Sequence, residues 1–391
     1  MAGNVIPEPK FHAHTDAGAP AAGYLLYSYS AGTSTPLSTY SESTLTTPNA
    51  NPTVLDARGE ATIFASPVSY KFVLKTAAGV TVWTVDNVVG IALGSDLTSV
   101  TTRVTALEAI PNRSGVCEGR LTLTTVTPVT TADVTAATTV YFTPYKGNRI
   151  GLYDGSSAWV VRSFTELSIA LGTDAANLPY DVFAYDNSGT VAIERLVWTN
   201  TTTRATALVL QNGVLVKSGA TTRRYLGTYL TTATIGQTED SDLKRYVWNY
   251  YNRIPKRLRV ADATASWVYT TATYRQANAA TGNQVAIVNG YLEELLALEA
   301  YHSFANSTAD VEASTSIGED STSAGTATTM SQSATSTVVN IKQQVRATLI
   351  KAPAVGYHYY AWLEKSAATG ACTWYGTSSF HVGGLLGTWR C

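Results

Sequence analysis

The chain has 391 residues and little charge: 14% are Asp, Glu, Lys or Arg, about half the usual share, and the formal net charge is −1. No basic cluster provides the positive surface that nucleic-acid binding requires. No apolar run approaches the roughly 18–20 residues that span a bilayer, and the opening stretch MAGNVIPEPKFHAH lacks the apolar centre of a secretory signal. We therefore expect a soluble protein made in a cytoplasm, with neither nucleic acid nor membrane as a partner.

The composition favours β structure. Thr, Ala, Ser and Val dominate and there are 23 tyrosines, and Thr, Val and Tyr fit the pleated surface of a strand. The length predicts two to four domains. We expect an all-β chain of three sandwich-like or jelly-roll-like units, with a short coiled-coil helix between the first and the second. The predicted boundaries are residues 1–90, 91–111, 112–235 and 236–391.

The first unit, residues 1–90, is predicted to be a small β-sandwich. The segment AAGYLLYSYSAG has the apolar density of a buried strand bounded by glycines. In SYKFVLK, the residues Tyr70, Phe72 and Leu74 alternate with Lys and Val, the period of two that is typical of a strand. The segment AAG at 77–79 predicts a turn, and VTVWTV then predicts the returning strand of a hairpin.

Several segments of this unit resemble the N-terminal module of bacteriophage tail fibre, tailspike and other virion-appendage proteins. These segments are YLLYSYSAGTSTP, TPNANP, VLDARGEA, YKFVLK and VTVWTVDNV, and the matching region covers about a fifth of the chain. The resemblance implies a structural protein of the virion, with this module near an attachment or assembly point. The later segments RRYLGTYLTT, DLKRYVWNYYNR and SWVYTTATYRQAN resemble uncharacterised phage structural proteins, which implies no activity.

A short heptad pattern follows the first unit. Apolar residues recur there with spacings of 4, 3, 4 and 3, the a/d pattern of a coiled coil: Leu93, Leu97, Val100, Val104 and Leu107. Arg103 falls at a g position and Glu108 at the following e position, where they can pair between chains. The alternative is a single amphipathic helix packed on its own domain. Because the appendages that this chain resembles usually contain three chains, we expect a parallel homotrimer.

Strand candidates fill the rest of the chain. Residues 112–235 contain RLTLTTV, TVYFTPY, AWVVRSF, YDVFAY, TVAIERLVW and ATALVLQ, and Asn212-Gly213 suits a two-residue type I′ hairpin. Residues 236–391 contain about eight more candidates, including QVAIVN, QQVRATLIK and GYHYYAWLEK. The segment ELLALEAYHSF has good helix formers, but its alternation from Leu296 to Phe304 predicts a strand. Such spacing favours a jelly roll or a related sandwich.

The aromatic residues of the last unit define one candidate site. Tyr360 and Trp362 share one face of the strand GYHYYAWLEK, and Trp374 follows in ACTWYG. If these rings stacked on sugars, the protein would be a receptor-binding adhesin for a host surface glycan. We favour the alternative that one set of rings forms the sandwich core while the other lines a subunit contact, where Tyr and Trp are common.

Metal binding and catalysis have weaker support. His12 and His14 are two residues apart, so in a strand they point the same way and could bind a metal. We favour the alternative that they lie on an exposed polar strand face, and we assign no metal and no cofactor. The carboxylate pairs Glu293-Glu294 and Glu319-Asp320 have the residue types of a glycosidase. Adjacent strand residues face opposite ways, and the repeats of a β-helical depolymerase are absent. We therefore assign no catalytic residue and expect that the chain is not an enzyme; a glycan depolymerase is the weakest alternative.

Three cysteines, Cys117, Cys372 and Cys391, cannot form a closed intrachain framework. Reduced thiols are the first expectation. Cys391 follows the glycine-rich segment GGLLGTWR, which predicts an accessible thiol that could form an interchain disulfide. Taken together, the sequence predicts a fibre-type appendage of a phage tail, neck or head, made in the bacterial host cytoplasm and located in the virion. It would dock to other virion proteins by its N-terminal module and project β domains outward.

Overall fold

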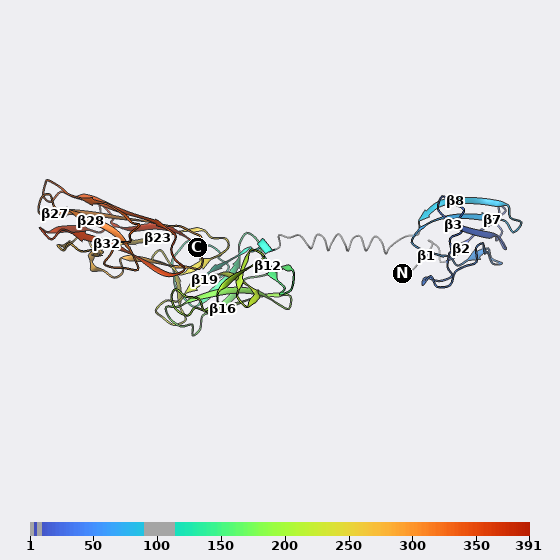
Figure 1. Cartoon of the computed structure of the whole chain (residues 1–391), viewed down its shortest axis with the longest axis horizontal. Helices are drawn as coiled ribbons and strands as arrows, with labels where there is room; N and C mark the ends of the chain where they lie inside the picture. The colour runs from blue at the N-terminus through green and yellow to red at the C-terminus, as the bar shows by residue number, and fades with distance from the viewer. Residues whose placement is uncertain (1–3, 6–9, 90–113) are drawn as a thin grey trace. The chain divides into compact units, whose positions relative to one another are not determined.

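The structure is a computed structural model that describes residues 4–5, 10–89 and 114–391 (Figure 1). The chain divides into two compact units, residues 1–110 and residues 111–391. No α-helix occurs in the described residues, and strands account for the regular structure of both units. The all-β prediction is confirmed for this part of the chain.

The predicted coiled coil lies outside the described residues. This applies to the helix expected over residues 91–111 and to the residues proposed for its contacts: Leu93, Leu97, Val100, Arg103, Val104, Leu107 and Glu108. The heptad therefore stays a prediction from sequence.

The N-terminal unit is built on a four-stranded antiparallel sheet in the order β4-β3-β7-β8. The alternation predicted for β7 is confirmed, since Tyr70, Phe72 and Leu74 are buried and their neighbours face outward. The predicted hairpin between β7 and β8 is also confirmed, with Gly79 at a φ of 81° in its turn. The strands of this unit are β1 (Asn4–Val5), β2 (Phe11–His12), β3 (Leu25–Ser30), β4 (Thr53–Val54), β5 (Glu60–Ala61), β6 (Phe64–Ala65), β7 (Ser69–Lys75) and β8 (Thr81–Val89).

The segment VLDARGEA makes a tight turn in this unit. The Oδ1 atom of Asp56 accepts hydrogen bonds from the backbone N–H groups of Arg58 and Glu60 at 2.8 and 3.0 Å. Gly59 has a φ of 71°, and a Cβ there would lie 2.5 Å from the carbonyl oxygen of Ala13. This position therefore requires glycine for both conformation and space, which gives the motif a structural role.

The larger unit begins with three antiparallel sheets around one core. The predicted type I′ hairpin is confirmed: Gln211 pairs with Val214, and Asn212 and Gly213 both have positive φ, at 50° and 83°. The strands of these sheets are β9 (Gly119–Thr122), β11 (Thr139–Pro144) and β14 (Leu167–Ala170); β12 (Arg149–Tyr153) and β13 (Trp159–Ser163); and β15 (Pro179–Asn187), β16 (Thr190–Val197), β17 (Leu208–Gln211), β18 (Val214–Lys217), β19 (Ala220–Leu230) and β22 (Val247–Asn249).

Two large sheets pack face to face in the rest of this unit, and their buried apolar residues form two clusters. The strand predicted from Leu296 is confirmed as β27, and it pairs with β31 in full register. The first sheet contains β10 (Val134–Ala137), β20 (Thr238–Asp240), β21 (Lys244–Arg245), β25 (Arg275–Gln276), β26 (Gln284–Asn289), β28 (Ala313–Glu319), β30 (Ser333–Ala334) and β32 (Gly356–Ser366). The second contains β23 (Pro255–Ala261), β24 (Trp267–Tyr269), β27 (Leu296–Asn306), β29 (Met330–Ser331), β31 (Gln343–Lys351), β33 (Cys372–Tyr375) and β34 (Gly384–Arg390), and a short 3₁₀ segment, η2 (Ala277–Ala279), follows β25.

The boundary predicted near residue 235 does not separate two compact units. Strand β10 pairs with β20, and β19 pairs with β22, so sheets join the two sides of that boundary. The buried Asn249 side chain accepts from the backbone N–H of Leu121 at 2.6 Å and donates to its carbonyl at 3.2 Å. The separation into 112–235 and 236–391 is therefore corrected to one packed body, because pairing between distant strands leaves no local mark in the sequence.

Candidate functional site

The aromatic residues predicted to meet a glycan or a second subunit are in the sandwich core. Tyr360, Trp362 and Trp374 are all fully buried. Tyr360 and Trp362 point from β32 toward the second sheet, while Tyr357 and Tyr359 lie partly exposed on the other face. The first three residues are therefore corrected from candidate contact residues to core residues. The alternation was predicted properly, but the sequence did not show which face the second sheet covers.

The expectation of an accessible thiol at Cys391 is also corrected. Cys391 is fully buried, and Cys117 and Cys372 are buried as well, all as free thiols. The glycine-rich segment before Cys391 is not a loose tail but strand β34, which pairs with β23 and β27. Burial raises the pKa of the Cys391 thiol to about 11 and that of Cys372 to about 12. A buried, protonated thiol does not suit an interchain disulfide.

The two candidate metal ligands lie on the N-terminal unit. His12 and His14 are both exposed, with the buried Ala13 between them. The Nε2 atom of His12 lies 3.1 Å from Oε1 of Glu60. The other carboxylate oxygen of Glu60 accepts a hydrogen bond from Lys10 at 2.9 Å. Within the described ranges, no three His, Cys, Asp or Glu side chains converge on a common point.

The carboxylate pairs are occupied by ion pairs. Glu293 and Glu294 both contact Arg253, at 2.6 and 3.5 Å. Glu319 pairs with Lys351 and accepts from the Tyr360 hydroxyl, while Asp320 lies 2.7 Å from Nδ1 of His358. Each of these four carboxylates therefore lies against a basic side chain.

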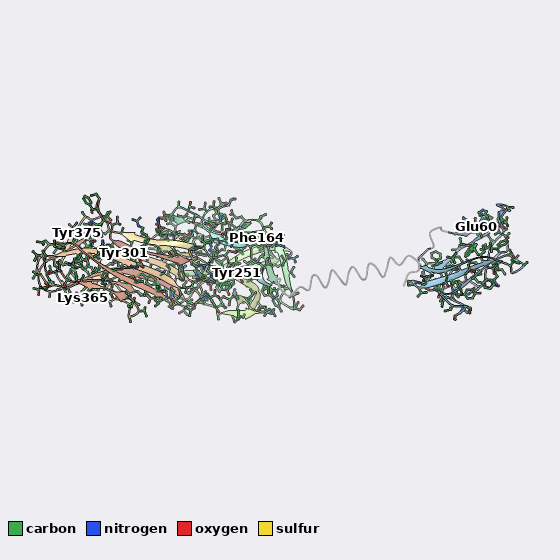
Figure 2. The ribbon with its side chains drawn as sticks, turned by 90° about the horizontal axis from the view of Figure 1, so that it is seen from above. Glu60, Phe164, Tyr251, Tyr301, Lys365 and Tyr375 are labelled. Atoms are coloured by element: carbon green, nitrogen blue, oxygen red, sulfur yellow. The ribbon has the colours of Figure 1, made fainter. Side chains whose placement is uncertain are left out.

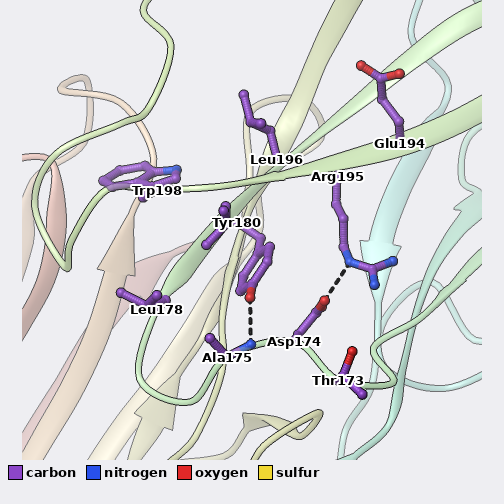
Figure 3. Close-up of a pocket in the computed structure, with 10 residues that line it drawn as sticks. Thr173, Asp174, Ala175, Leu178, Tyr180, Glu194, Arg195, Leu196 and Trp198 are labelled. Atoms are coloured by element: carbon purple, nitrogen blue, oxygen red, sulfur yellow. Dashed lines mark hydrogen bonds and ion pairs between the residues drawn. The ribbon is translucent and has the colours of Figure 1, made fainter.

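An open pocket of about 790 Å³ lies between the segment 173–180 and strand β16 (Figure 3). Its polar groups bond mainly to one another or to the core. Nε of Arg195 donates to Asp174 at 2.8 Å, and the other oxygen of Asp174 accepts from the Tyr229 hydroxyl at 2.6 Å. The Tyr180 hydroxyl accepts from the backbone N–H of Ala175 at 2.7 Å. Both oxygens of the buried Asp174 carboxylate are therefore engaged, while the second carboxylate of the pocket, Glu194, pairs with Lys217 and Arg223 at 3.4 and 3.1 Å.

A second open region covers the outer side of the sheet β23-β34-β27-β31, named here the outer sheet face. Strand register aligns its outward side chains in rows across the strands. One row contains Arg257, Thr388, Ala297 and Ile350, and the next contains Arg259, Leu386, Glu299 and Thr348. A groove of about 550 Å³ runs over the first row and over Leu386, Glu299 and Thr348 of the second.

Exposed apolar and aromatic side chains mark this face and its border. Ile350, Leu386 and Tyr301 are 60%, 44% and 40% exposed on neighbouring strands. In the loop before β34, which is a strand of this sheet, Phe380 is 96% exposed. Ile350 and Leu386 line the same groove, and apolar side chains gathered on one surface mark contact sites more often than isolated exposed residues do.

The outer sheet face is also positively charged. Its strands direct four arginines and one carboxylate outward: Arg257, Arg259, Arg346, Arg390 and Glu299. Arg346 lies 5.3 Å over the Tyr301 ring and pairs with Glu299, and the Lys342 ammonium lies 4.0 Å over the Tyr375 ring. The hydrogen bond from Tyr301, together with the Arg346 pair, lowers the pKa of Glu299. These contacts hold cationic groups in place on the surface.

A smaller surface of similar chemistry occurs on the N-terminal unit, named here the N-terminal sheet face. The rings of Tyr27 and Tyr29 stack at 6.2 Å on the outward side of β3. The Lys75 ammonium lies 5.1 Å over Tyr27 and that of Lys71 lies 5.3 Å over Tyr29. Val82, on β8, is 42% exposed. The alternation in YLLYSYS and YKFVLK could have predicted this face. In both segments buried residues alternate with partly exposed ones, and the partly exposed residues form the N-terminal sheet face.

Comparisons with known proteins define no family. No family model and no curated protein matches the chain. Solved structures with partial likeness include three proteins of Bacillus thuringiensis. These are the insecticidal delta-endotoxin Cry8Ea1 (6% identity, 70% of this chain and 52% of that chain, TM-score 0.21), a Cry1Da tryptic core variant (8%, 65% and 48%, TM-score 0.19) and the insecticidal crystal protein Cry7Ca1 (10%, 70% and 51%, TM-score 0.16). The chain spans about half the length of these proteins, and TM-scores this low do not define a shared fold. No described helix has the length and apolarity needed to cross a membrane.

Proposed function

We propose that the chain is a structural component of a bacteriophage virion, a fibre-type appendage of the tail, neck or head. Its N-terminal unit docks to a neighbouring virion protein and its larger β unit projects outward. The proposal comes from the resemblance of the first unit to appendage modules, and the division of the chain into two compact units supports it. The protein would be made in the host cytoplasm and act in the particle.

The N-terminal sheet face is the observation that supports docking. It combines partly exposed tyrosine rings with two lysines and an exposed valine on one side of a small sheet. Interfaces that bind specifically are enriched in Tyr and depleted of charge at their centre. Here the two ammonium groups lie over rings and form no ion pair with a carboxylate of the described residues, which keeps them available to an acidic partner.

Antibody labelling of the chain on intact particles tests the proposal. We expect label at one defined position on each particle. The charge reversal Lys71→Glu with Lys75→Glu should reduce the number of copies per particle at least tenfold, while Arg58→Glu, an exposed change elsewhere on the same unit, should leave it unchanged. A chain absent from purified particles, or equal incorporation of both variants, would contradict the proposal.

The heptad over residues 93–108 leads us to propose a parallel homotrimer. Two heptads alone are marginal, since isolated helices under about 12–15 residues are unstable in water, so the flanking β units must also associate. Light scattering of the purified chain should give three times the monomer mass, and Leu97→Asp with Val104→Asp should lower it. A monomer at micromolar concentration, unaffected by these changes, would contradict the trimer.

A receptor-binding adhesin is the second candidate function. The outer sheet face favours it, because this face presents exposed apolar, hydroxyl and cationic groups across several strands. The residues first considered for glycan binding, Tyr360, Trp362 and Trp374, are buried and have no part in it. No enzymatic activity is proposed.

A further inference from the structure

The outer sheet face differs from the solvated side of an ordinary sandwich. One row combines cationic, hydroxyl and apolar groups, in Arg257, Thr388, Ala297 and Ile350, and the next adds the carboxylate of Glu299. An ordinary outer face places polar residues at these positions. The exposed Ile350 and Leu386 lie on either side of β27, so they border the groove where it crosses that strand.

The charge of this face is positive although the chain as a whole has a formal net charge of −1. Arg257 donates from Nε to Asp242 at 2.8 Å, and Arg346 pairs with Glu299. For Arg259 and Arg390, no ion pair exists among the described residues. The face therefore retains cationic groups for a negatively charged ligand.

From this arrangement we infer that the outer sheet face binds an acidic polysaccharide. The inference rests on the second candidate function and names its ligand class. Carboxylates spaced along such a chain would lie against Arg259, Arg346 and Arg390. Sugar hydroxyls would bond to Thr348 and Thr388, and the apolar sides of the sugar rings would pack on Ile350 and Leu386.

The shape and charge of the face favour this ligand over two others. A second copy of the chain presenting the same face would bring like charges together, which opposes a symmetric contact. Single-stranded nucleic acid is held largely by base stacking on open aromatic faces. The rings of Tyr301 and Tyr375 are instead covered by Arg346 and Lys342. An open groove crossing several strands suits a linear polymer that runs perpendicular to them.

Titration calorimetry on the full chain tests the inference with named polymers. We expect measurable binding of hyaluronan or polysialic acid and none of neutral dextran. Affinity should fall as the salt concentration rises from about 50 to about 300 mM, because salt screens the attraction between exposed charges. The double change Arg259→Ala and Arg346→Ala should weaken binding at least tenfold.

The structure supplies a matched control. Lys365 lies 5.5 Å over the Tyr274 ring on the opposite sheet, the same kind of pair as Arg346 over Tyr301. Lys365 is on β32 and Tyr301 is on β27, so they belong to different sheets, and Figure 2 labels both at the same end of the larger unit. Lys365→Ala should leave affinity unchanged, and thermal unfolding should show that both variants fold.

Three outcomes would overturn the inference. They are no binding of either acidic polymer, equal loss of binding in the control, and equally tight binding of duplex DNA, which would indicate unspecific attraction of polyanions. A change of mass in light scattering with Arg259→Ala and Arg346→Ala would assign the face to self-association instead. Particle labelling answers a separate question, so failure of the polysaccharide site and failure of the appendage role can be told apart.

Discussion

Nε2 of His302 lies 3.9 Å from a carboxylate oxygen of Glu364, and neither side chain is exposed to solvent. The two residues come from opposite sheets of the sandwich, β27 and β32. His302 lies among the rings of Trp267, Trp362 and Trp374, and its nitrogens have no hydrogen-bond partner within the described structure. Glu364 accepts from Nε1 of Trp267 and Nε of Arg275, both at 2.8 Å.

Burial acts on these two groups in opposite directions. It raises the pKa of Glu364 to about 7, against the lowering effect of Trp267 and Arg275. It lowers the pKa of His302 well below its usual value. The Glu364 carboxyl stays protonated to a higher pH in the folded state than in the unfolded state. Its contribution to stability is therefore present below about pH 4.5 and is lost as the pH rises through about 7. The contribution of His302 is present above about pH 6.5 and lost as the pH falls.

The first prediction is that single variants expose these opposing slopes. Relative to the unmodified chain, Glu364→Gln should gain stability from pH 5 to pH 7.5, by no more than about 3 kcal/mol for a shift of this size. For His302→Phe we expect the opposite pH dependence. The free energy of unfolding of this variant, relative to the unmodified chain, should rise as the pH falls from 7.5 to 5. Urea unfolding at both pH values measures this. Parallel pH profiles for both variants and the unmodified chain would show that neither group titrates as described.

The second prediction concerns the thiols. Cys117, Cys372 and Cys391 are buried with raised pKa values, so none should react with a soluble disulfide reagent within minutes at pH 8. All three should react once guanidinium unfolds the chain. Absorbance of the released thiol gives the count directly. If one thiol reacts fast in the unmodified chain and this reaction is lost in Cys391→Ser, the thiol of Cys391 is accessible, as the sequence predicted.

The third prediction tests the single packed body of residues 111–391. Asn249→Ala should cost about 2–4 kcal/mol, because both backbone groups of Leu121 lose a buried partner. Hydrogen exchange should then speed up on both sides of residue 235 together. Asn200→Ala, which removes bonds in an exposed turn, should cost less than about 1 kcal/mol. Faster exchange on one side alone would indicate two independent domains.

The fourth prediction concerns the turn in VLDARGEA. Gly59→Ala should destabilise the N-terminal unit by more than about 2 kcal/mol, because it adds a clash with Ala13 to the strain of a positive φ. Gly79→Ala, at a φ of 81° in open space, supplies the strain without the clash and should cost about 1 kcal/mol. Hydrogen exchange of peptides from residues 10–89 reports the effect. Equal effects of the two changes would mean that the clash at Gly59 is relieved.

Local pattern predicted much of the secondary structure. The alternation of Tyr70, Phe72 and Leu74 and that beginning at Leu296 each identify a strand, because side chains alternate between two faces whatever packs on them. The turn at Asn212-Gly213 follows from its own backbone preferences. Such features depend on residues close together in the chain, and sequence alone was enough to find them.

The sequence by itself therefore determined the β class, individual strands and their two faces, and the turns between several of them. Only the tertiary structure decided which face of β32 is core, so that Tyr360 and Trp362 are buried and the outer sheet face is on β23, β27, β31 and β34. It also made the segment before Cys391 a strand that pairs with β23 and β27 and leaves Cys391 buried. The physical reason is that burial depends on which distant strands pair and which sheets stack, and those contacts join residues more than a hundred positions apart, as Asn249 and Leu121 do.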